Sequence, residues 1–260
     1  MTMMRLKLGL LEEDLAFRFF VSQSHVSNVL NTWLCLLHQH IVVKPKWWPS
    51  REIVHKLSPE DVMTDFPNLC IIIDATEMRT QRPSDPRAQS AFYSQYKSHH
   101  TLKGLVAIAP FGAVVFASDL YPGSTSDQEL TEKSGLIDLL EPGDDILADR
   151  GFTISAVCKK RNIGISIPPF LDNRGQLPRN ELSSARVMAR HRMLVEHVLS
   201  RVKLFRILSN VIMLKCIRSV SMLWQVCCFL VNFQQPVHYH GVHKWQQECI
   251  STLSSSCACS

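Results

Sequence analysis

The sequence predicts an α/β fold, a mixed sheet flanked by helices, with a small helix-turn-helix at its N-terminal side. Three observations predict it: short β-branched runs alternate with helical segments after residue 67, two helical patterns precede residue 42, and the composition suits a packed core. The chain has 260 residues, of which 46% are hydrophobic and 20% are charged. Global disorder is excluded, and the length allows one sizeable domain with a small accessory module.

Residues 1–42 carry the pattern of a helix-turn-helix. A first helix is expected over Glu12–Phe20, and Ser22 is a suitable N-cap for a second helix with apolar residues every three or four positions. In DNA-binding units of this kind, the N-terminal residues of the second helix face the major groove. The polar residues at that place are Gln23, Ser24, His25, Ser27 and Asn28. A plain helical hairpin packed on the main domain remains the alternative.

Residues 43–66 are expected to form a connector rather than a regular element, because prolines and two tryptophans, Trp47 and Trp48, punctuate a basic stretch. This connector either touches DNA or docks onto the core. Residues 67–235 are expected to form the main domain, and residues 236–260 a flexible tail.

The main domain is predicted to contain three strands, then a helix, a strand, a helix, a strand and a final helix. These elements are expected over residues 70–73, 105–109, 113–117, 126–140, 145–148, 153–161, 163–167 and 182–207. The most apolar stretch, residues 222–233, is shorter than the roughly 20 residues that a membrane span requires. We therefore expect a buried core helix there and no contact with a membrane.

Three acids fall at informative places on this pattern. Asp74 ends the first predicted strand and Asp149 ends the fourth, so adjacent strands would bring both carboxylates to one edge of the sheet. Glu196 lies midway along the last helix, which can cross that edge. Three carboxylates can hold two divalent ions about 3.5–4 Å apart for an in-line phosphodiester displacement. Their hard oxygens suit Mg²⁺ or Mn²⁺.

Each acid also has a structural alternative. Asp74 can cap a turn, and Asp149 can pair with a neighbouring arginine or cap the next helix. Glu196 can form a solvated pair with Arg192, one helical turn before it. A fourth acid, Asp127, lies where a helix N-terminus attracts negative charge.

Four blocks in this order resemble the landmarks of Harbinger-type DDE transposases, which carry a DDE superfamily endonuclease domain. They are DATE at 74–77, YPGSTSD at 121–127, LADRGF at 147–152 and VEH at 195–197. The resemblance covers roughly residues 67–233 and implies an RNase H-like fold with metal-dependent DNA cleavage and strand transfer. It places the catalytic, metal-binding acids at Asp74, Asp149 and Glu196. Asp127 matches another recurrent acid of that family and is the alternative second ligand.

DNA is the expected partner, since the net charge is +5 and basic residues gather in two segments. The candidates for phosphate contacts are Lys97, Lys103, Arg192, Arg201 and Lys203. Solvated charged faces are the alternative. Nine scattered cysteines without a preceding signal sequence indicate reduced thiols, and we expect a nuclear protein. A homodimer or a separate DNA-binding partner protein is compatible with the sequence, as is a domesticated, inactive DNA-binding or adaptor protein.

Overall fold

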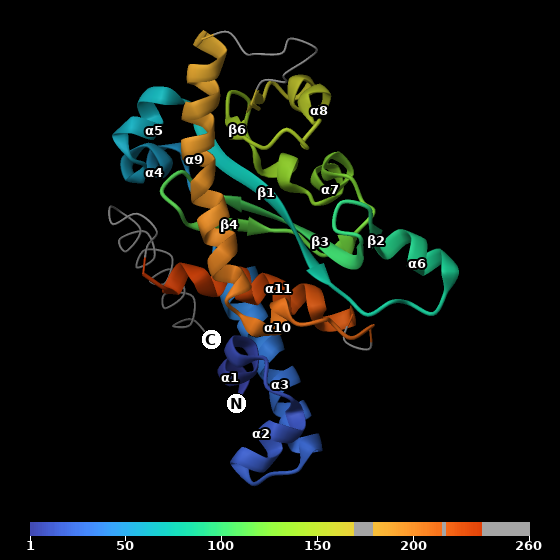
Figure 1. Ribbon diagram of the computed structural model, residues 1–260. Coiled ribbons are helices and arrows are strands. Elements are labelled where there is room, and N and C mark those ends of the chain that lie inside the picture. Colours follow the sequence, from blue (N-terminus) through green and yellow to red (C-terminus); the bar gives the residue numbers. More distant parts are fainter. Residues whose placement is uncertain (169–178, 215–216, 236–260) are drawn as a thin grey trace.

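The computed structural model describes residues 1–168, 179–214 and 217–235, and the structural statements below concern these residues. They form a mixed sheet flanked by helices, from which an N-terminal helical unit projects (Figure 1). The strands are β1 (Leu69–Arg79), β2 (Tyr93–Ser94), β3 (His99–Ile108), β4 (Val114–Ala117), β5 (Tyr121–Pro122), β6 (Asp145–Leu147) and β7 (Gly164–Ser166). The predicted α/β fold is confirmed.

The helices surround this sheet and include short 3-10 and π-helical turns. They are α1 (Thr2–Leu8), α2 (Glu12–Phe19), α3 (Gln23–Leu37), η1 (His38–Val43), α4 (Arg51–Leu57), α5 (Glu60–Asp65), α6 (Pro86–Phe92), α7 (Asp127–Lys133), η2 (Leu136–Leu139), α8 (Ser155–Lys160), α9 (Arg179–Lys203), α10 (Arg206–Ser209), α11 (Ile217–Leu230) and η4 (Val231–Phe233). Within the described residues, no helix is long and apolar enough to cross a membrane.

The sheet has the order β2-β3-β1-β6-β7, with β4 and β5 also paired to β3. β1 runs antiparallel to β3 and parallel to β6, and β6 runs parallel to β7. The expectation that the first strand lies beside the strand before Asp149 is therefore confirmed. Ile71, Ile72 and Ile73 are at most 1% exposed, because helices cover both faces of this central strand.

β1 is longer than the sequence indicates, which corrects the place of Asp74. The strand continues to Arg79, so Asp74 lies in its middle rather than at its end. Its extension is held by a long antiparallel ladder with β3, which begins at His99 and pairs Arg79 with Thr101. These inter-strand hydrogen bonds fix an extended backbone where the side chains alone do not indicate a strand.

The N-terminal unit contains the two expected helices, α2 and α3, and an additional helix, α1. The Ser22 hydroxyl accepts a hydrogen bond from the amide of His25 at 3.2 Å, which confirms the predicted cap. Leu15 and Val26 are fully buried between the helices. The polar residues proposed to face DNA lie at the N-terminal end of α3, where all but the half-buried Ser27 are exposed.

Residues 51–65 correct the expectation of an irregular connector, because they form α4 and α5. Trp47 is only 4% exposed, stacks on Phe229 with ring centroids 5.3 Å apart, and donates its indole N–H to the carbonyl of Ile41. Arg51 binds Asp144 at 2.7 Å and so ties α4 to the sheet. Docking onto the core, rather than exposure, is thus the structural role of this segment.

Several helices and strands begin or end at other residues than the sequence predicts. The predicted helix over 126–140 divides at Gly135, whose φ of 80° ends it, into α7 and η2. The long helix α9 ends at Lys203 rather than at residue 207, and it crosses β1 (Figure 1). The elements α6, β2 and β5 were not predicted, and α11 is the expected core helix. The predicted tail, residues 236–260, lies outside the described residues.

Candidate active site

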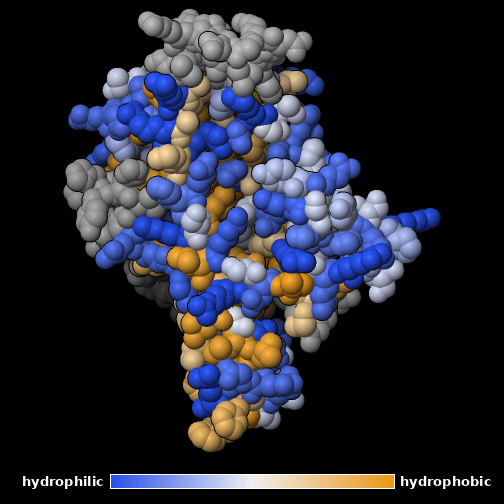
Figure 2. Space-filling view, viewed as in Figure 1, coloured by the Kyte–Doolittle hydropathy of each residue, from blue (hydrophilic) through white to orange (hydrophobic). Residues whose placement is uncertain are grey.

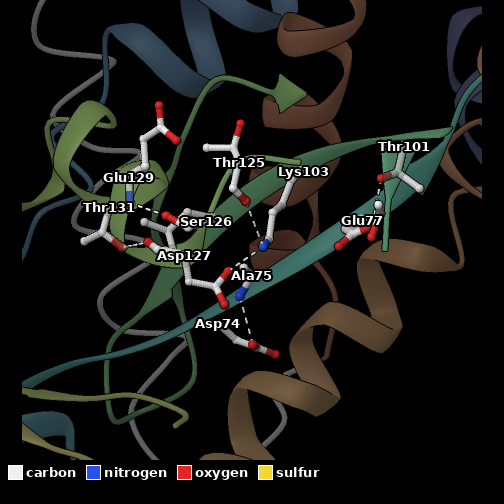
Figure 3. A network of polar contacts seen from close by, with 12 residues as sticks. Asp74, Ala75, Glu77, Thr101, Lys103, Thr125, Ser126, Asp127, Glu129 and Thr131 are labelled. Carbon is white, nitrogen blue, oxygen red and sulfur yellow. Dashed lines mark hydrogen bonds and ion pairs between the residues drawn. The ribbon is translucent and has the colours of Figure 1, made fainter. Parts of the chain in front are cut away.

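Asp74 occupies the centre of the sheet and is largely shielded from solvent. It pairs with Val106 of β3, and its Oδ1 accepts a hydrogen bond from the amide of Ala75 at 2.8 Å (Figure 3). Ile73 before it on β1 and the facing Leu105 and Val106 of β3 are apolar and buried, so the carboxylate emerges from a low-dielectric surface.

Asp149 follows the end of β6, directly after the buried Leu147 and Ala148. The parallel pairing of β6 with β1 brings it to the same side of the sheet as Asp74. Its side chain is 47% exposed, and its Oδ1 accepts a hydrogen bond from the amide of Arg150 at 2.7 Å. The carboxylate is therefore partly solvated.

Glu196 projects from α9 beside the helix face that packs on the sheet. Val195, Val198 and Val202 are fully buried on that face, whereas the Glu196 side chain is 54% exposed. The apolar spacing of α9 thus fixes the helix and points Glu196 toward the acids of the sheet.

One cavity of about 660 Å³ joins these elements. It is lined by Asp74, Asp149, Glu196 and the rival acid Asp127, so the structure brings all four acids to one place. Four of the proposed phosphate-binding residues, Lys97, Lys103, Arg192 and Lys203, also line it. Arg201 does not line the cavity, and its guanidinium donates a hydrogen bond to the carbonyl of Gln235 instead.

Arg192 is the central counter-charge of the cavity. Its guanidinium lies 3.1 Å from Asp149 Oδ1 and 3.6 Å from Glu196 Oε1, and its side chain is only 13% exposed. The pairing of Glu196 with the residue one turn earlier is therefore present. Asp149 pairs with this distant arginine, a contact that the sequence order does not reveal.

Asp127 is held by a second cation. Lys103 Nζ lies 2.7 Å from Asp127 Oδ1 and donates to the carbonyl of Thr125 at 3.2 Å (Figure 3). A Cβ on Gly151 would lie 2.6 Å from Asp127 Oδ2, so a larger residue there would push the Asp127 carboxylate away from its present position. Sequence reasoning missed Gly151, although it follows Asp149 within a quoted block.

Burial dominates the electrostatics of Asp74. Desolvation raises the pKa of its carboxyl from 3.8 to about 6, against the lowering influence of the Ala75 amide and Arg192. Asp149 and Glu196 raise it further through charge repulsion. Any additional cation near Asp74 would therefore stabilise the ionised form of its carboxylate.

The raised pKa has a consequence for stability. The folded state holds the Asp74 proton more tightly than the unfolded state, so ionisation lowers the free energy of unfolding as pH rises from about 4 to 6. In EDTA at pH 7.5, Asp74→Asn is expected to raise the free energy of unfolding by about 2 kcal/mol, measured by urea unfolding. The gain should shrink as the pH falls and be nearly absent at about pH 3, where Asp74 is largely protonated in both states. An equal gain at both pH values would contradict this origin.

The donor set fits hard divalent cations by its chemistry. Four carboxylates line the cavity, and Asp149 and Glu196 are exposed enough to reorient. In the present arrangement Arg192 and Lys103 neutralise three of the acids. No group of three metal-ligating side chains among the described residues is arranged to hold an ion. Metal binding would therefore require Asp149 and Glu196 to separate from Arg192.

Comparisons with known proteins agree with this arrangement. The family model described as "DDE superfamily endonuclease" matches residues 73–232, and "Helix-turn-helix of DDE superfamily endonuclease" matches residues 1–42. A probable transposase for insertion sequence element IS702 of Microchaete diplosiphon is 30% identical over 144 residues. The match covers 54% of this chain and 48% of that protein, so the chain spans about half of its relative's length. No solved structure matches significantly. The endonuclease model covers more than half of the chain, which therefore belongs to the DDE superfamily endonuclease family.

Proposed function

We propose that this chain is a transposon-derived DNA endonuclease of the Harbinger type, which uses divalent metal ions to cleave phosphodiester bonds and transfer the strand. The observation that carries the proposal is the single cavity lined by Asp74, Asp149 and Glu196, on three elements that are distant in sequence. The family match and the transposase relative support it.

Asp74, Asp149 and Glu196 would hold the metal ions, with Asp127 as the alternative second ligand. Bound Mg²⁺ or Mn²⁺ would activate the attacking oxygen and stabilise the leaving oxygen. The half-buried Asp74 would anchor the site because β1 and β3 hold its backbone in an extended ladder. The exposed Asp149 and Glu196 adjust around it.

The cations of the cavity would bind and orient the DNA backbone. Lys97, Lys103 and Lys203 reach the cavity from the turn before β3, from β3 itself and from the end of α9. Ammonium groups on three sides position a phosphate without reading its sequence. Sequence readout is assigned to the exposed polar end of α3 in the helix-turn-helix.

The test is cleavage of supercoiled plasmid by the purified chain in Mn²⁺ or Mg²⁺, with EDTA as the control. Metal-dependent nicking supports the nuclease. Salt-dependent DNA binding without nicking in either metal would contradict it.

A domesticated, inactive DNA-binding or adaptor protein is the second candidate. The observation that favours it is the neutralisation of Asp149 and Glu196 by Arg192, and of Asp127 by Lys103. In this case the ion pairs would hold the cavity closed to metal and the chain would only bind DNA.

Mn²⁺ binding by the wild type separates the two candidates without turnover, because the inactive protein would hold the cavity closed to metal. Arg192→Gln then tests the part that this arginine plays. If Arg192 is a counter-ion that yields to metal, its removal should tighten Mn²⁺ binding about tenfold, measured by calorimetry without DNA. The matched control is Arg190→Gln, because Arg190 lies two residues away but pairs with Asp61 and Asp65 on α5. An unchanged Mn²⁺ affinity in Arg192→Gln would contradict the yielding counter-ion.

A further inference from the structure

A second hollow opens beside the acidic cavity. Its volume is about 1100 Å³, and it lies between the α6–β2 projection and the start of β3. Glu77, Tyr96 and Lys103 line both hollows, so the two adjoin each other. Figure 2 shows mainly hydrophilic side chains over the projection that carries α6 in Figure 1. Neither the family models nor the relative's name assigns a role to this groove.

The groove is rich in positive charge. Arg82 and Arg87 line it together with Lys103, which is already paired with Asp127, whereas Glu77 is the single carboxylate among its described lining residues. Glu77 already accepts a hydrogen bond from the Thr101 hydroxyl at 2.8 Å (Figure 3). This balance favours a polyanionic chain that continues from the acidic cavity.

Two aromatic side chains that line the same groove are exposed to solvent. Tyr96 is 85% exposed, and the ammonium of Lys97 lies 4.5 Å from its ring centroid. Tyr93 is 42% exposed and contacts His100 edge-on, with ring centroids 5.5 Å apart. Since Tyr93 is fixed in β2, which pairs with β3, its ring is positioned before any ligand arrives.

Exposed aromatic rings beside cations are typical of sites that bind unpaired nucleotides. Each base can stack on a ring while its phosphate contacts a positive charge. A paired base in a duplex does not offer its face to such a ring. We propose that the groove binds an unpaired DNA segment, the single-stranded extension of the duplex whose phosphodiester enters the acidic cavity. This inference rests on the proposed nuclease function and names the form of its substrate.

The experiment measures DNA binding by the full chain in EDTA, so that no turnover is involved. Fluorescence anisotropy compares a blunt duplex with the same duplex carrying a four-nucleotide single-stranded extension at either end. A third duplex carries the extension as RNA. The wild type is expected to bind the DNA-extended duplex about tenfold more tightly than the blunt one.

Tyr96→Ala should remove most of this advantage and leave blunt-duplex binding unchanged, whereas Tyr96→Phe should keep it because the ring remains. The salt dependence of Tyr96→Ala should equal that of the wild type, since stacking releases no counterions. Arg87→Gln should instead lower the salt dependence for the extended duplex. A 2-aminopurine in the extension should lose fluorescence on binding to the wild type but not to Tyr96→Ala. Lys160→Gln, an exposed change on α8, is the control.

Equal affinity of the wild type for blunt and extended duplexes would overturn the inference and leave the nuclease intact. The inference would also be overturned if Tyr96→Ala lost affinity equally for the blunt and the extended duplex, or if the wild type preferred the RNA extension. If the wild type bound none of the DNAs, the proposed function would fall as well. Tyr96 is a surface residue, so its substitution tests binding rather than folding.

Discussion

Asp149→Asn is expected to lower the rate of metal-dependent DNA cleavage by about a thousandfold while leaving the fold intact. Metal ions stabilise the transition state of phosphoryl displacement by several kcal/mol, and each 1.36 kcal/mol of lost stabilisation slows the reaction tenfold. The asparagine has the size of the aspartate, and its amide oxygen can still accept the Arg150 amide hydrogen bond seen at 2.7 Å. The measurement is plasmid nicking in Mn²⁺, with the midpoint of thermal unfolding recorded for each variant.

Asp138→Asn is the matched control for this loss. Asp138 is 67% exposed, pairs with Arg161 at 2.6 Å and does not line the cavity. Its substitution should leave nicking unchanged.

Asp127→Asn decides between the two candidates for the second ligand, because both acids line the same cavity. Cleavage at the wild-type rate by Asp149→Asn, together with its loss in Asp127→Asn, would assign the second position to Asp127.

The sequence predicts the elements that their own side chains determine. The isoleucine run of β1, the short strand before Asp149 and the alternation with helices each carry a local signal. The parallel pairing of β1 with β6 is seen only in the folded chain, because the antiparallel-paired strands β2 to β5 and the helices α6, α7 and η2 lie between them in the sequence. The convergence of Asp74, Asp149 and Glu196 on one cavity is therefore predicted from the sequence only on the assumption that these two strands are neighbours.

The parts that escape prediction depend on distant partners. The second half of β1, from Ala75 to Arg79, is extended because β3 supplies its hydrogen bonds, and no local pattern records that pairing. Trp47 is buried because α11 and η4 present Phe229 and Phe233 to it, nearly two hundred residues later. In both cases tertiary contacts decide the conformation, and local propensity does not reveal it.

The charge balance of the cavity escaped prediction for the same reason. Spacing indicates the pair between Arg192 and Glu196, which lie on one helix. The pairs from Arg192 to Asp149 and from Lys103 to Asp127 each join two elements that only the folded sheet brings together. Lys103 and Arg192 were expected to bind phosphate, and the structure adds that both already neutralise an acid.

Trp224→Ala is expected to lower the free energy of unfolding by about 3–5 kcal/mol, because it would leave a large cavity between α11 and the sheet. Trp224 is 1% exposed and faces Gly104 of β3, where an added Cβ would lie 2.9 Å from the indole. Urea unfolding measures the loss. Trp33→Ala, on an exposed position of α3, is the control and should cost far less. A similar cost for both would contradict the packing role of Trp224.

Two further variants show whether the contact with Gly104 is what makes Trp224 important. The Trp224 indole N–H is buried without a hydrogen-bond partner among the described residues, so Trp224→Phe removes an unsatisfied donor while filling most of the space. Its cost should stay below about 1.5 kcal/mol. Gly104→Ala should destabilise the wild type but cost clearly less when combined with Trp224→Ala, because the space above β3 is then open. Additive costs in the double variant would show that the two residues do not limit one another, and that the glycine is required by Leu120, whose Cδ2 lies 2.8 Å from the same Cβ position.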